Sequence, residues 1–574
     1  MYLFYLTMKT PNGLMALGIL VYAIILAILC PVLIKKEKYA VMRILCVLPL
    51  AAAVIHYGVY GSLTFSKFRY LYCECLIPFV YLLPGKSKIF GGIKSVVSAA
   101  GVLLLCVYHG VNSIGCPMIH NYTRYSYSES FDKMLSTLEK EHCLNSWKRI
   151  DYDMLRERYM PAVEEAERNC NEAAYAEIIK EVCYRFYDIH TGAHLNGSLY
   201  EQVDDALTGN NYGLSMIRLD DGSVIAICTC PDYEEYGYVS MARKCGIHDG
   251  TRILSWDGKD IDEALAEIEC IAKKFPVVEN EEVFKPICLA GKGGESVDIT
   301  FINDDGEVQS ASLSDEGIYE IDYYVTASSL LYHWNSDTKN FSSRMLDDKC
   351  GYLRISVEHY DSLKDNIAAA RGGYYPELTE YYAEIIKGLI DQGMEYLVID
   401  IRDNGGGYDC IGGALVSLFT DEKRHMVAFG YEDADGYHIK ENQYIFPDGR
   451  YKDLPVVALT NSECVSAGDG LAKYLADCDN VTLMGVTASS GVNQNNGGYI
   501  YLTENITVKY PVFLSLSEDG EPFIDTDYTR TNRIPLEETI PMTKEFALKM
   551  FSIEDNYPEK QDPELEYAIA YLEK

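Results

Sequence analysis

Ser466 stands at a point in the sequence where a hydroxyl could act as a nucleophile. The apolar run Val456–Leu459 predicts a buried strand, and Ala467–Ala476 predicts a helix that begins directly after the serine. The first turn of a helix exposes backbone N–H groups, and its dipole favours negative charge, so an oxyanion formed on an attacked carbonyl would be stabilised there. Serine is also a common helix N-cap, which is the plainer interpretation of this position.

A glycine run forms a second candidate site. Gly405-Gly406-Gly407 follows the predicted buried strand Leu397–Ile401. Glycine adopts unusual dihedral angles and lets backbone N–H groups approach a substrate closely. A merely flexible turn is the alternative. Asp400 and Arg402 are expected to hold this loop in shape, because an arginine beside a strand end usually pairs with a carboxylate or with carbonyls.

Motifs for metal or cofactor chemistry are not found in the sequence. It contains no H-E-x-x-H and no G-x-x-x-x-G-K-[ST] phosphate loop. Its 18 cysteines form no paired C-x-x-C set and no Cys/His cluster with zinc-ligand spacing. We therefore expect no metal and no cofactor.

Four stretches in order along the chain carry a family resemblance. They are Phe186–Thr191 (F-Y-D-I-H-T), the run from Tyr212 to Gly258, Val398–Gly407 (V-I-D-I-R-D-N-G-G-G) and Asn461–Asp469 (N-S-E-C-V-S-A-G-D). They resemble, in turn, the L-x-D-x-H-T segment, a PDZ domain, the D-x-R-x-N-x-G-G loop and the nucleophile loop of C-terminal-processing (tail-specific) and tricorn-type serine peptidases. The resemblance implies a PDZ-like β domain and a crotonase-like ββα peptidase core of α/β class.

The resemblance also implies roles for individual residues. Ser466 would be the nucleophile. An amide of Gly406 or Gly407, together with the amide of Ala467, would form the oxyanion hole.

A serine needs a base to attack near neutral pH. The tail-specific branch of the family uses a lysine downstream of the serine, but no lysine occurs between Lys473 and Lys509. The tricorn-type branch uses a histidine of the helical region, and His190 matches that position, with His194 as the second candidate. A serine precedes the histidine in that branch, whereas Ile189 stands here, which leaves open what orients His190.

An acidic residue near the end of the domain belongs to the tricorn-type site. Asp525 and Asp527 lie in the matching stretch, and either could hold the tautomer of the histidine through a second serine, such as Ser489 or Ser490. Asp188, two residues before the histidine, could equally cap a turn or take part in the chemistry.

Gly213 and Leu214 match the carboxylate-binding loop of the PDZ-like stretch. Such modules add an extended peptide as a strand and bind its terminal carboxylate with backbone N–H groups, so both residues are expected to bind substrate. A domain that gates the active site without binding peptide is the alternative.

Three kinds of structural element, each predicted from a sequence pattern, must position these residues. Apolar residues at helical spacing predict helices over residues 128–187, and short runs around Asp-Gly turns predict hairpins from about residue 211. Strands alternate with helices from about residue 350, which is typical of an α/β unit. The expected domains are a helical N-terminal segment of the peptidase (117–205), the PDZ-like domain (206–320), the α/β peptidase core (321–545) and a helical tail (546–574).

The first 116 residues predict a transmembrane region of about four helices. The uncharged runs Leu14–Ile34, Ile44–Ser66 and Ser95–Cys116 are long enough, at about 1.5 Å per residue, to cross a hydrocarbon core of about 30 Å. The shorter run Tyr70–Pro84 is a possible fourth span. Lysines flanking the first and last runs place both loops in the cytoplasm. We expect a multi-pass protein of the cell membrane that contacts the bilayer through residues 1–116 and holds its catalytic domain outside the cytoplasm.

The charge of the chain is uneven. The net charge is −35, but residues 1–116 hold ten Lys or Arg and two acidic residues, and the remainder holds 40 basic and 83 acidic residues. An acidic body repels phosphates, so we expect no nucleic-acid partner.

The sequence therefore predicts a membrane-anchored serine endopeptidase that cleaves polypeptides outside the cytoplasm. One alternative is an inactive protein that keeps the PDZ and peptidase folds and only binds peptides. The other is a membrane sensor or transporter whose outer part binds a ligand.

Overall fold

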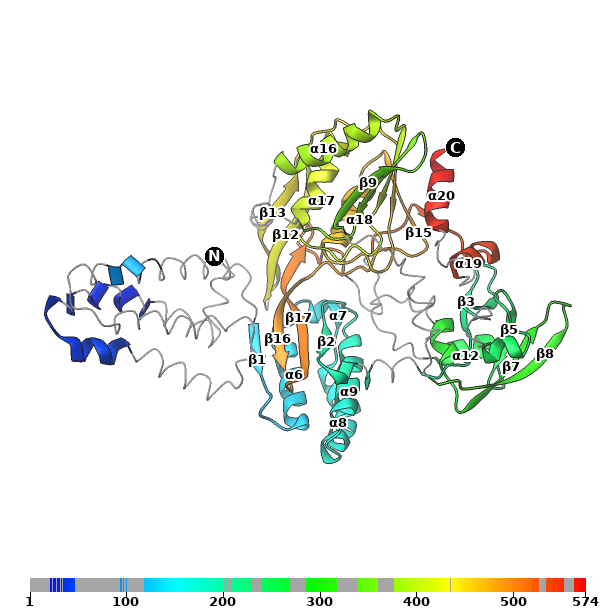
Figure 1. The fold of residues 1–574 in the computed structure, drawn as a ribbon, viewed down its shortest axis with the longest axis horizontal. Helices are drawn as coiled ribbons and strands as arrows, with labels where there is room; N and C mark the ends of the chain where they lie inside the picture. Colours follow the sequence, from blue (N-terminus) through cyan, green and yellow to red (C-terminus); the bar gives the residue numbers. More distant parts are fainter. Residues whose placement is uncertain are drawn as a thin grey trace.

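The computed structural model is a mixed α/β protein of several domains (Figure 1). It describes residues 118–200, 202–203, 209–229, 239–268, 285–317, 339–359, 376–433, 435–525, 533–551 and 562–574. It also describes 21–46 without 23, 27, 31 and 34, and residues 93, 94, 96, 97 and 100.

The predicted transmembrane region is wrong for the described residues. In this part of the chain, no helix combines the length and apolar composition needed to cross a bilayer. The helical stretch from Val21 ends at a turn where Glu37 has a φ of 56°, and Leu26 and Cys30 pack against Met42 and Cys46 of the next stretch. The other predicted spans lie mostly outside the described residues, which do not include 47–66, 70–84 or 101–116. This finding also contradicts the predicted multi-pass location in the cell membrane.

The helices predicted over residues 128–187 are α6 (Tyr127–Glu141), α7 (Asn145–Lys148), α8 (Tyr152–Arg168) and α9 (Glu172–Tyr184). Side-chain caps fix the starts of three of them, because Ser126, Asp151 and Asn171 each accept a backbone N–H of the following turn. The apolar faces of α6, α8 and α9 form one core with the inner residues of two strands of the neighbouring sheet.

That sheet has the order β1-β16-β17-β12-β13. The short strand β2 pairs with residues 506–509 of β17, whereas β12 pairs with residues 514–516. Its strands are β1 (Met118–Asn121), β2 (Gly192–Leu195), β12 (Arg424–Asp433), β13 (Gly436–Ile445), β16 (Asn495–Tyr501) and β17 (Ile506–Leu516). Gly192 of β2 lies opposite Lys509 of β17. The sheet therefore fixes the chain two residues after His190 against a strand from the far end of the sequence.

The core sheet has the order β18-β15-β14-β11-β10-β9. Its strands are β9 (Phe341–Met345), β10 (Cys350–Ile355), β11 (Tyr396–Asp400), β14 (Val456–Leu459), β15 (Val481–Gly485) and β18 (Glu538–Thr539). All neighbours are parallel except β9 and β10. Alternating residues of β11 pack into two hydrophobic cores on opposite faces of the sheet, Leu397 and Ile399 into one and Val398 into the other.

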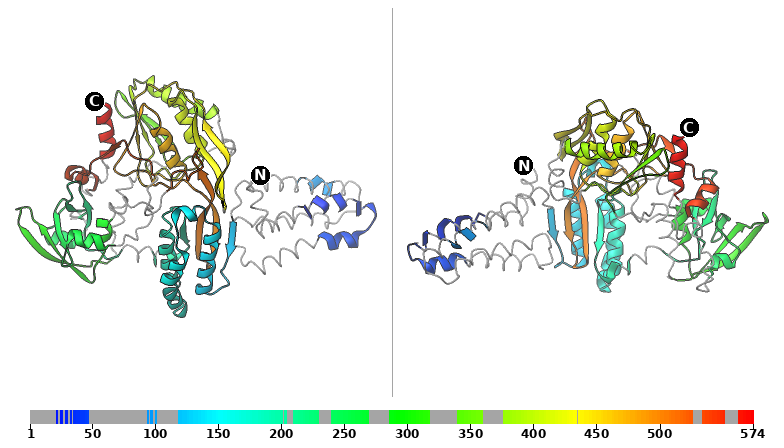
Figure 2. Two further views of the ribbon diagram at one scale, coloured as in Figure 1. Left: turned by 180° about the vertical axis from the view of Figure 1, so that it is seen from behind. Right: turned by 45° about the horizontal axis from the view of Figure 1, so that its top comes forward.

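Helices cover both faces of the core sheet (Figures 1 and 2). One face carries α16 (Pro376–Ile390), α17 (Asp409–Val416) with the 3-10 turn η2 (Ser417–Phe419), and α18 (Ala467–Ala476). The other carries α19 (Lys544–Phe551) and α20 (Pro563–Leu572). Burial on both faces explains the continuous apolar runs from which these strands were predicted.

The third sheet is antiparallel, with the order β3-β4-β5-β7-β8 and β6 beside β5. It comprises β3 (Ser215–Arg218), β4 (Val224–Ile227), β5 (Arg252–Trp256), β6 (Lys259–Asp260), β7 (Ser296–Ile302) and β8 (Val308–Ser314), with α11 (Met241–Lys244) and α12 (Ile261–Glu267). The hairpins predicted around Asp221-Gly222 and Asp305-Gly306 are confirmed. One side of β3 and β4 packs on α19, which joins this sheet to the core sheet.

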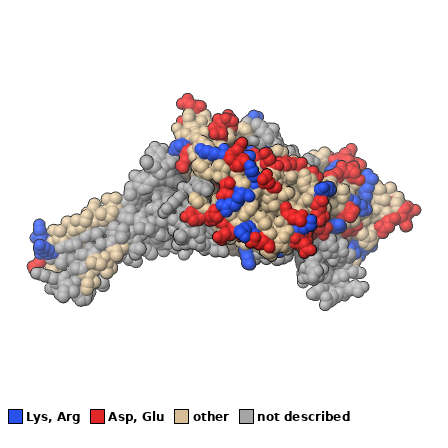
Figure 3. Space-filling model, turned by 90° about the horizontal axis from the view of Figure 1, so that it is seen from above, with Lys and Arg blue, Asp and Glu red and all other residues tan. Residues whose placement is uncertain are grey.

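Acidic side chains are spread over the face of the molecule in Figure 3, with basic side chains among them. This agrees with the acidic excess of the chain beyond residue 116.

Candidate active site

Ser466 occupies a strained turn between β14 and α18. Its φ and ψ are 60° and −126°, a combination that residues other than glycine rarely adopt, and its side chain makes no capping bond to the helix. The plain N-cap interpretation is therefore wrong. A strained turn from a strand into a helix is the arrangement that exposes the nucleophile in many serine hydrolases.

The Ser466 turn is held by the segment Gly491–Asn493. The Ser466 N–H donates to the carbonyl of Val492 (3.0 Å), and the Asn493 side chain donates to the Ser466 carbonyl (2.6 Å). In the first turn of α18, the buried Asp469 carboxylate accepts the N–H groups of Gly491 (2.8 Å) and Val492 (3.0 Å). Side chains and backbone together thus fix the direction of the turn.

The glycine loop lies directly against this turn. The Val465 N–H donates to the Asn404 carbonyl (2.9 Å), and a Cβ atom on Gly406 would lie 2.6 Å from the Cβ of Ser466. The Gly406 N–H is already donated to the Asn404 side-chain oxygen (2.8 Å). Within the described residues, the N–H groups of Gly407 and Ala467 have no acceptor. Of the two glycines predicted as oxyanion donors, only Gly407 therefore has an available amide.

His190 is buried and pairs with Asp188. Its Nδ1 atom lies 3.2 Å from Asp188 Oδ1, which also accepts the His190 backbone N–H (2.8 Å). A carboxylate only accepts, so Nδ1 carries the proton and Nε2 is left as the acceptor. Burial alone would raise the pKa of Asp188, but the positive charge of Lys148 and the bond from His190 hold that pKa below its ordinary value.

Asp525 is fully buried and forms an ion pair with Lys148. Burial raises its pKa to about 7 against the charge of Lys148, and the charge of Asp188 adds to the rise. Asp525 also forms an antiparallel bridge with Val492, the acceptor of the Ser466 amide. Asp527 lies outside the described residues.

Residues 349–531, which hold Ser466, the glycine loop and Asp525, match the model of peptidase family S41. This match indicates a serine peptidase. A comparison with curated proteins finds no match.

Solved structures show distant similarity to the peptidase. Mature CPAF complexed with lactacystin is 15% identical, over 78% of this chain and 97% of that chain, with a TM-score of 0.49. The photosystem II D1 C-terminal processing protease is 16% identical, over 75% and 98%, with a TM-score of 0.30. The tricorn protease is 14% identical, over 78% and 36%, with a TM-score of 0.33. No TM-score here reaches 0.5, so the indication of a peptidase rests on the family match.

The other predicted residues of the peptidase lie elsewhere. His194 is exposed on β2, opposite Thr507 of β17. Gly213 and the buried Leu214 lie at the start of β3 in the third sheet, and the Gly213 N–H is donated to the Asn211 side chain (3.1 Å). Among the described residues, no group of three or more His, Cys, Asp or Glu side chains could hold a metal ion.

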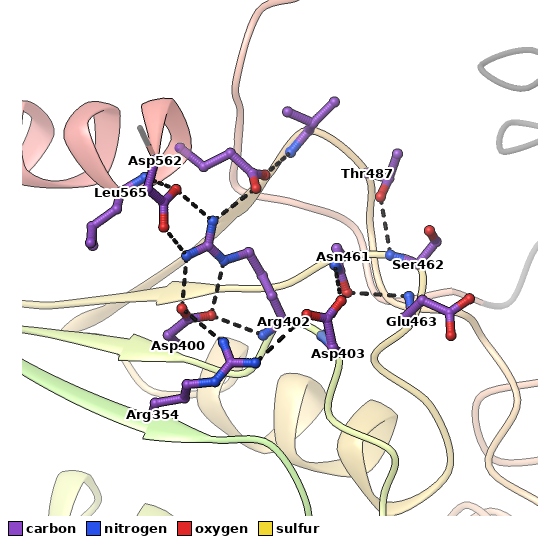
Figure 4. A network of polar contacts seen from close by, with 12 residues as sticks. Arg354, Asp400, Arg402, Asp403, Asn461, Ser462, Glu463, Thr487, Asp562 and Leu565 are labelled. Carbon is purple, nitrogen blue, oxygen red and sulfur yellow. Dashed lines mark hydrogen bonds and ion pairs between the residues drawn. The ribbon is translucent and has the colours of Figure 1, made fainter. Parts of the chain in front are cut away.

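A buried arginine joins the core sheet of the peptidase to its C-terminal helix (Figure 4). Arg402 is fully buried and forms ion pairs with Asp400 (2.7 Å), Asp562 (2.8 Å) and Glu564 (2.9 Å). Burial alone would lower the pKa of Arg402, but the three carboxylates raise it. Asp562 also caps α20 by accepting the Leu565 N–H (3.1 Å).

The same network reaches the loop that carries Ser466. Arg354 lies 3.3 Å from Asp400 and 3.6 Å from Asp403. The Asp403 N–H donates to the Asn461 side chain (2.9 Å), and that side chain donates back to the Asp403 carboxylate (2.8 Å). Asp400 and Arg402 thus hold the strand end from which the glycine loop departs, as expected.

Lys148 and Asn404 are the site residues that the sequence did not single out. Asn404 lies inside the D-x-R-x-N-x-G-G motif, so the motif itself could have pointed to it. Lys148 has no such signal, because it is one lysine in a helical stretch and its burial depends on residues that follow more than 370 positions later.

Proposed function

We propose that the peptidase is an endopeptidase that cleaves polypeptides, with Ser466 as nucleophile and His190 as general base. The observation that carries this proposal is the strained Ser466 turn packed against Gly406. The amides of Ala467, which follows the serine, and of Gly407, which follows Gly406, have no acceptor among the described residues. A hydroxyl and N–H groups without acceptors are the parts that acyl transfer requires.

The proposed reaction follows from these groups. Ser466 Oγ attacks the scissile carbonyl carbon while His190 Nε2 takes the hydroxyl proton. The N–H groups of Gly407 and Ala467 stabilise the oxyanion, and each such donor is worth about 10²–10³ in kcat. The imidazolium then gives its proton to the leaving amine, and water hydrolyses the acyl-enzyme by the same route.

Asp188 is the carboxylate that we propose to orient His190. Its contact with Nδ1 supports this role, because a bond at that atom holds the tautomer that the base needs and stabilises the imidazolium. Asp525, one of the two acids that the family resemblance implies, would act on His190 through its charge rather than through this bond.

Peptide binding by the PDZ-like sheet at Gly213 and Leu214 stays a prediction. A peptide carboxylate that used the Gly213 amide would first have to displace its bond to Asn211. Leu214 is buried, which supports a role for its side chain in packing.

A fluorophosphonate probe on the purified full-length protein tests the proposed nucleophile. We expect wild type to be labelled at Ser466 and Ser466→Ala to lose labelling and about 10⁴-fold or more of its peptide cleavage. Ser462→Ala is the matched control, because Ser462 is a buried serine of the same loop whose hydroxyl has no partner among the described residues. Full cleavage by Ser466→Ala would reject the proposal. Absence of both labelling and cleavage in wild type would favour the inactive peptide-binding protein.

A further inference from the structure

We propose that Lys148 is a positioning residue of the peptidase site, whose ammonium fixes the His190 segment relative to the Ser466 turn. This inference rests on the proposed function and extends it to a residue outside the matched family region, which begins at residue 349.

Lys148 ends the single turn α7, and the chain bends sharply on both sides of it. Leu144 and Arg149 flank this turn with φ angles of 62° and 54°. The Lys148 side chain is completely buried. A buried ammonium is strongly unfavourable unless it is paired and hydrogen-bonded, so its partners identify what the local fold is built to hold.

The ammonium joins two segments that meet only in the folded chain. It donates to the carbonyl of Tyr187 (3.1 Å) and to the carboxylate of Asp525. Tyr187 has a φ of 49° and begins the tight turn to His190, in which Asp188 accepts the His190 N–H. The bond to Tyr187 therefore fixes the start of the turn that carries the base.

The contacts continue from Asp525 to the nucleophile. Asp525 bridges Val492, and the Val492 carbonyl accepts the Ser466 N–H (3.0 Å). The neighbouring Asn493 N–H donates to Ile524 (3.0 Å), while the Asn493 side chain donates to the Ser466 carbonyl (2.6 Å). One buried side chain thus links both reacting segments.

Charge supports the same role. Asp525, Asp188, Cys143 and His142 surround Lys148 and His190. Without the ammonium, Asp188 and Asp525 would be buried without their positive counter-charge, and the attraction that holds their two segments together would be lost.

Lys148→Met in the full-length protein tests the proposal, because methionine keeps the length of the side chain and removes its charge. We expect kcat to fall about 10²-fold with KM changed less than about twofold, since misplacement of reacting groups acts on the chemical step.

Leu155→Ala is the matched control for lost stability. Leu155 is a buried apolar residue of α8 in the same helical layer. Its variant should be destabilised but keep the kcat of wild type after correction for the folded fraction. If Lys148→Met prevents folding, Lys148→Met with Asp525→Asn removes both charges together, which buried pairs often tolerate. The double variant should then fold and still show the lowered kcat.

Hydrogen exchange separates failure of this inference from failure of the proposed function. Peptides covering residues 187–194 and 490–494 should exchange faster in Lys148→Met than in Leu155→Ala. If Lys148→Met keeps the kcat and the exchange rates of wild type, the positioning role is overturned while the proposed hydrolysis stands. If Ser466→Ala keeps full cleavage, the proposed function fails. The link made by Lys148 is then judged by hydrogen exchange alone: faster exchange of the two peptides in Lys148→Met supports it, and wild-type exchange overturns it.

Discussion

A Cβ atom on Gly406 would lie 2.6 Å from the Cβ of Ser466. The same atom would lie 2.8 Å from the Val465 carbonyl oxygen, so no side chain fits between the two loops. Two motifs separated by some 60 residues therefore form a single unit around Ser466.

Gly406→Ala should force this unit apart. Gly406 also has a φ of 78°, which alanine adopts only with strain. We expect a fall in kcat of about 10²-fold and a loss of stability of about 1–3 kcal/mol, measured by peptide hydrolysis and urea unfolding. Gly405→Ala is the matched control, because a Cβ there meets no atom within 4 Å. Equal effects of the two substitutions would contradict this account.

Arg402→Met should destabilise the chain strongly. The substitution leaves Glu564 buried without its counter-charge and leaves Asp400 to pair with Arg354, and breaking such a buried pair costs about 3–5 kcal/mol. Urea unfolding measures this loss, and proteolysis should cut α20 faster once its tether to the core sheet is gone. Arg450→Met is the comparison, because Arg450 pairs with Glu380 and Asp448 at the surface and should contribute about 1 kcal/mol or less. Similar urea midpoints for both variants would count against the tether.

His142 should make the fold sensitive to mild acid. Its Nδ1 faces the Cys143 carbonyl (2.5 Å) and its Nε2 faces the Thr191 hydroxyl (2.9 Å), an arrangement that suits the neutral ring. Burial lowers the pKa of His142 from 6.5 to about 4. Between pH 6.5 and pH 4, His142 therefore binds a proton in the unfolded chain but not in the folded chain. The free energy of unfolding then falls as the pH drops from 6.5 to 4, by up to about 3 kcal/mol.

His142→Gln removes this titration and should lose less stability than wild type over the same pH window. The exposed His248, changed to Gln, should leave the wild-type slope unchanged. Unfolding free energies measured at several pH values provide the comparison, and parallel slopes for all three proteins would refute the assignment to His142.

Glu358 should act in the opposite direction. It is fully buried beside the glycine loop, its Oε2 accepts the Gly412 N–H (3.2 Å), and burial and the charge of Asp409 raise its pKa well above the ordinary value. Its contribution to stability is then complete below about pH 4.5 and declines as the pH rises, because the unfolded chain releases its proton first.

Glu358→Gln mimics the neutral acid and does not titrate. Its stability relative to wild type should rise between pH 5 and pH 8 in urea unfolding, whereas the exposed Glu380→Gln should not show this rise. A constant difference between Glu358→Gln and wild type across this range would show that the Glu358 carboxyl is ionised in the folded chain.

Local motifs predicted the elements that carry the nucleophile. The strand Val456–Leu459 and the helix Ala467–Ala476 have the bounds expected from their apolar patterns, and the glycine loop follows its buried strand as predicted. The same reliance on apolar patterns produced the transmembrane prediction, because an apolar run is equally able to pack against another helix, as Leu26 and Cys30 do with Met42 and Cys46.

The choice between neighbouring residues depended on side-chain contacts that no pattern encodes. Gly406 and Gly407 are equivalent in sequence, but the Asn404 side chain occupies the Gly406 amide and leaves that of Gly407. Asp188 was one of several acids that could have served His190. It lies within 3.2 Å of Nδ1 in a turn whose Tyr187 carbonyl accepts a bond from Lys148.

The sequence by itself thus determined the chemistry that the chain carries: a serine before a helix, a glycine loop after a buried strand, and a histidine at the end of a helical segment. The tertiary structure alone decided which carboxylate, amide and ammonium groups lie in the segments around them. Short-range patterns reflect local backbone preference, whereas the pairing of Lys148 with Asp525 arises from burying charges that lie far apart in the chain and are stable only together.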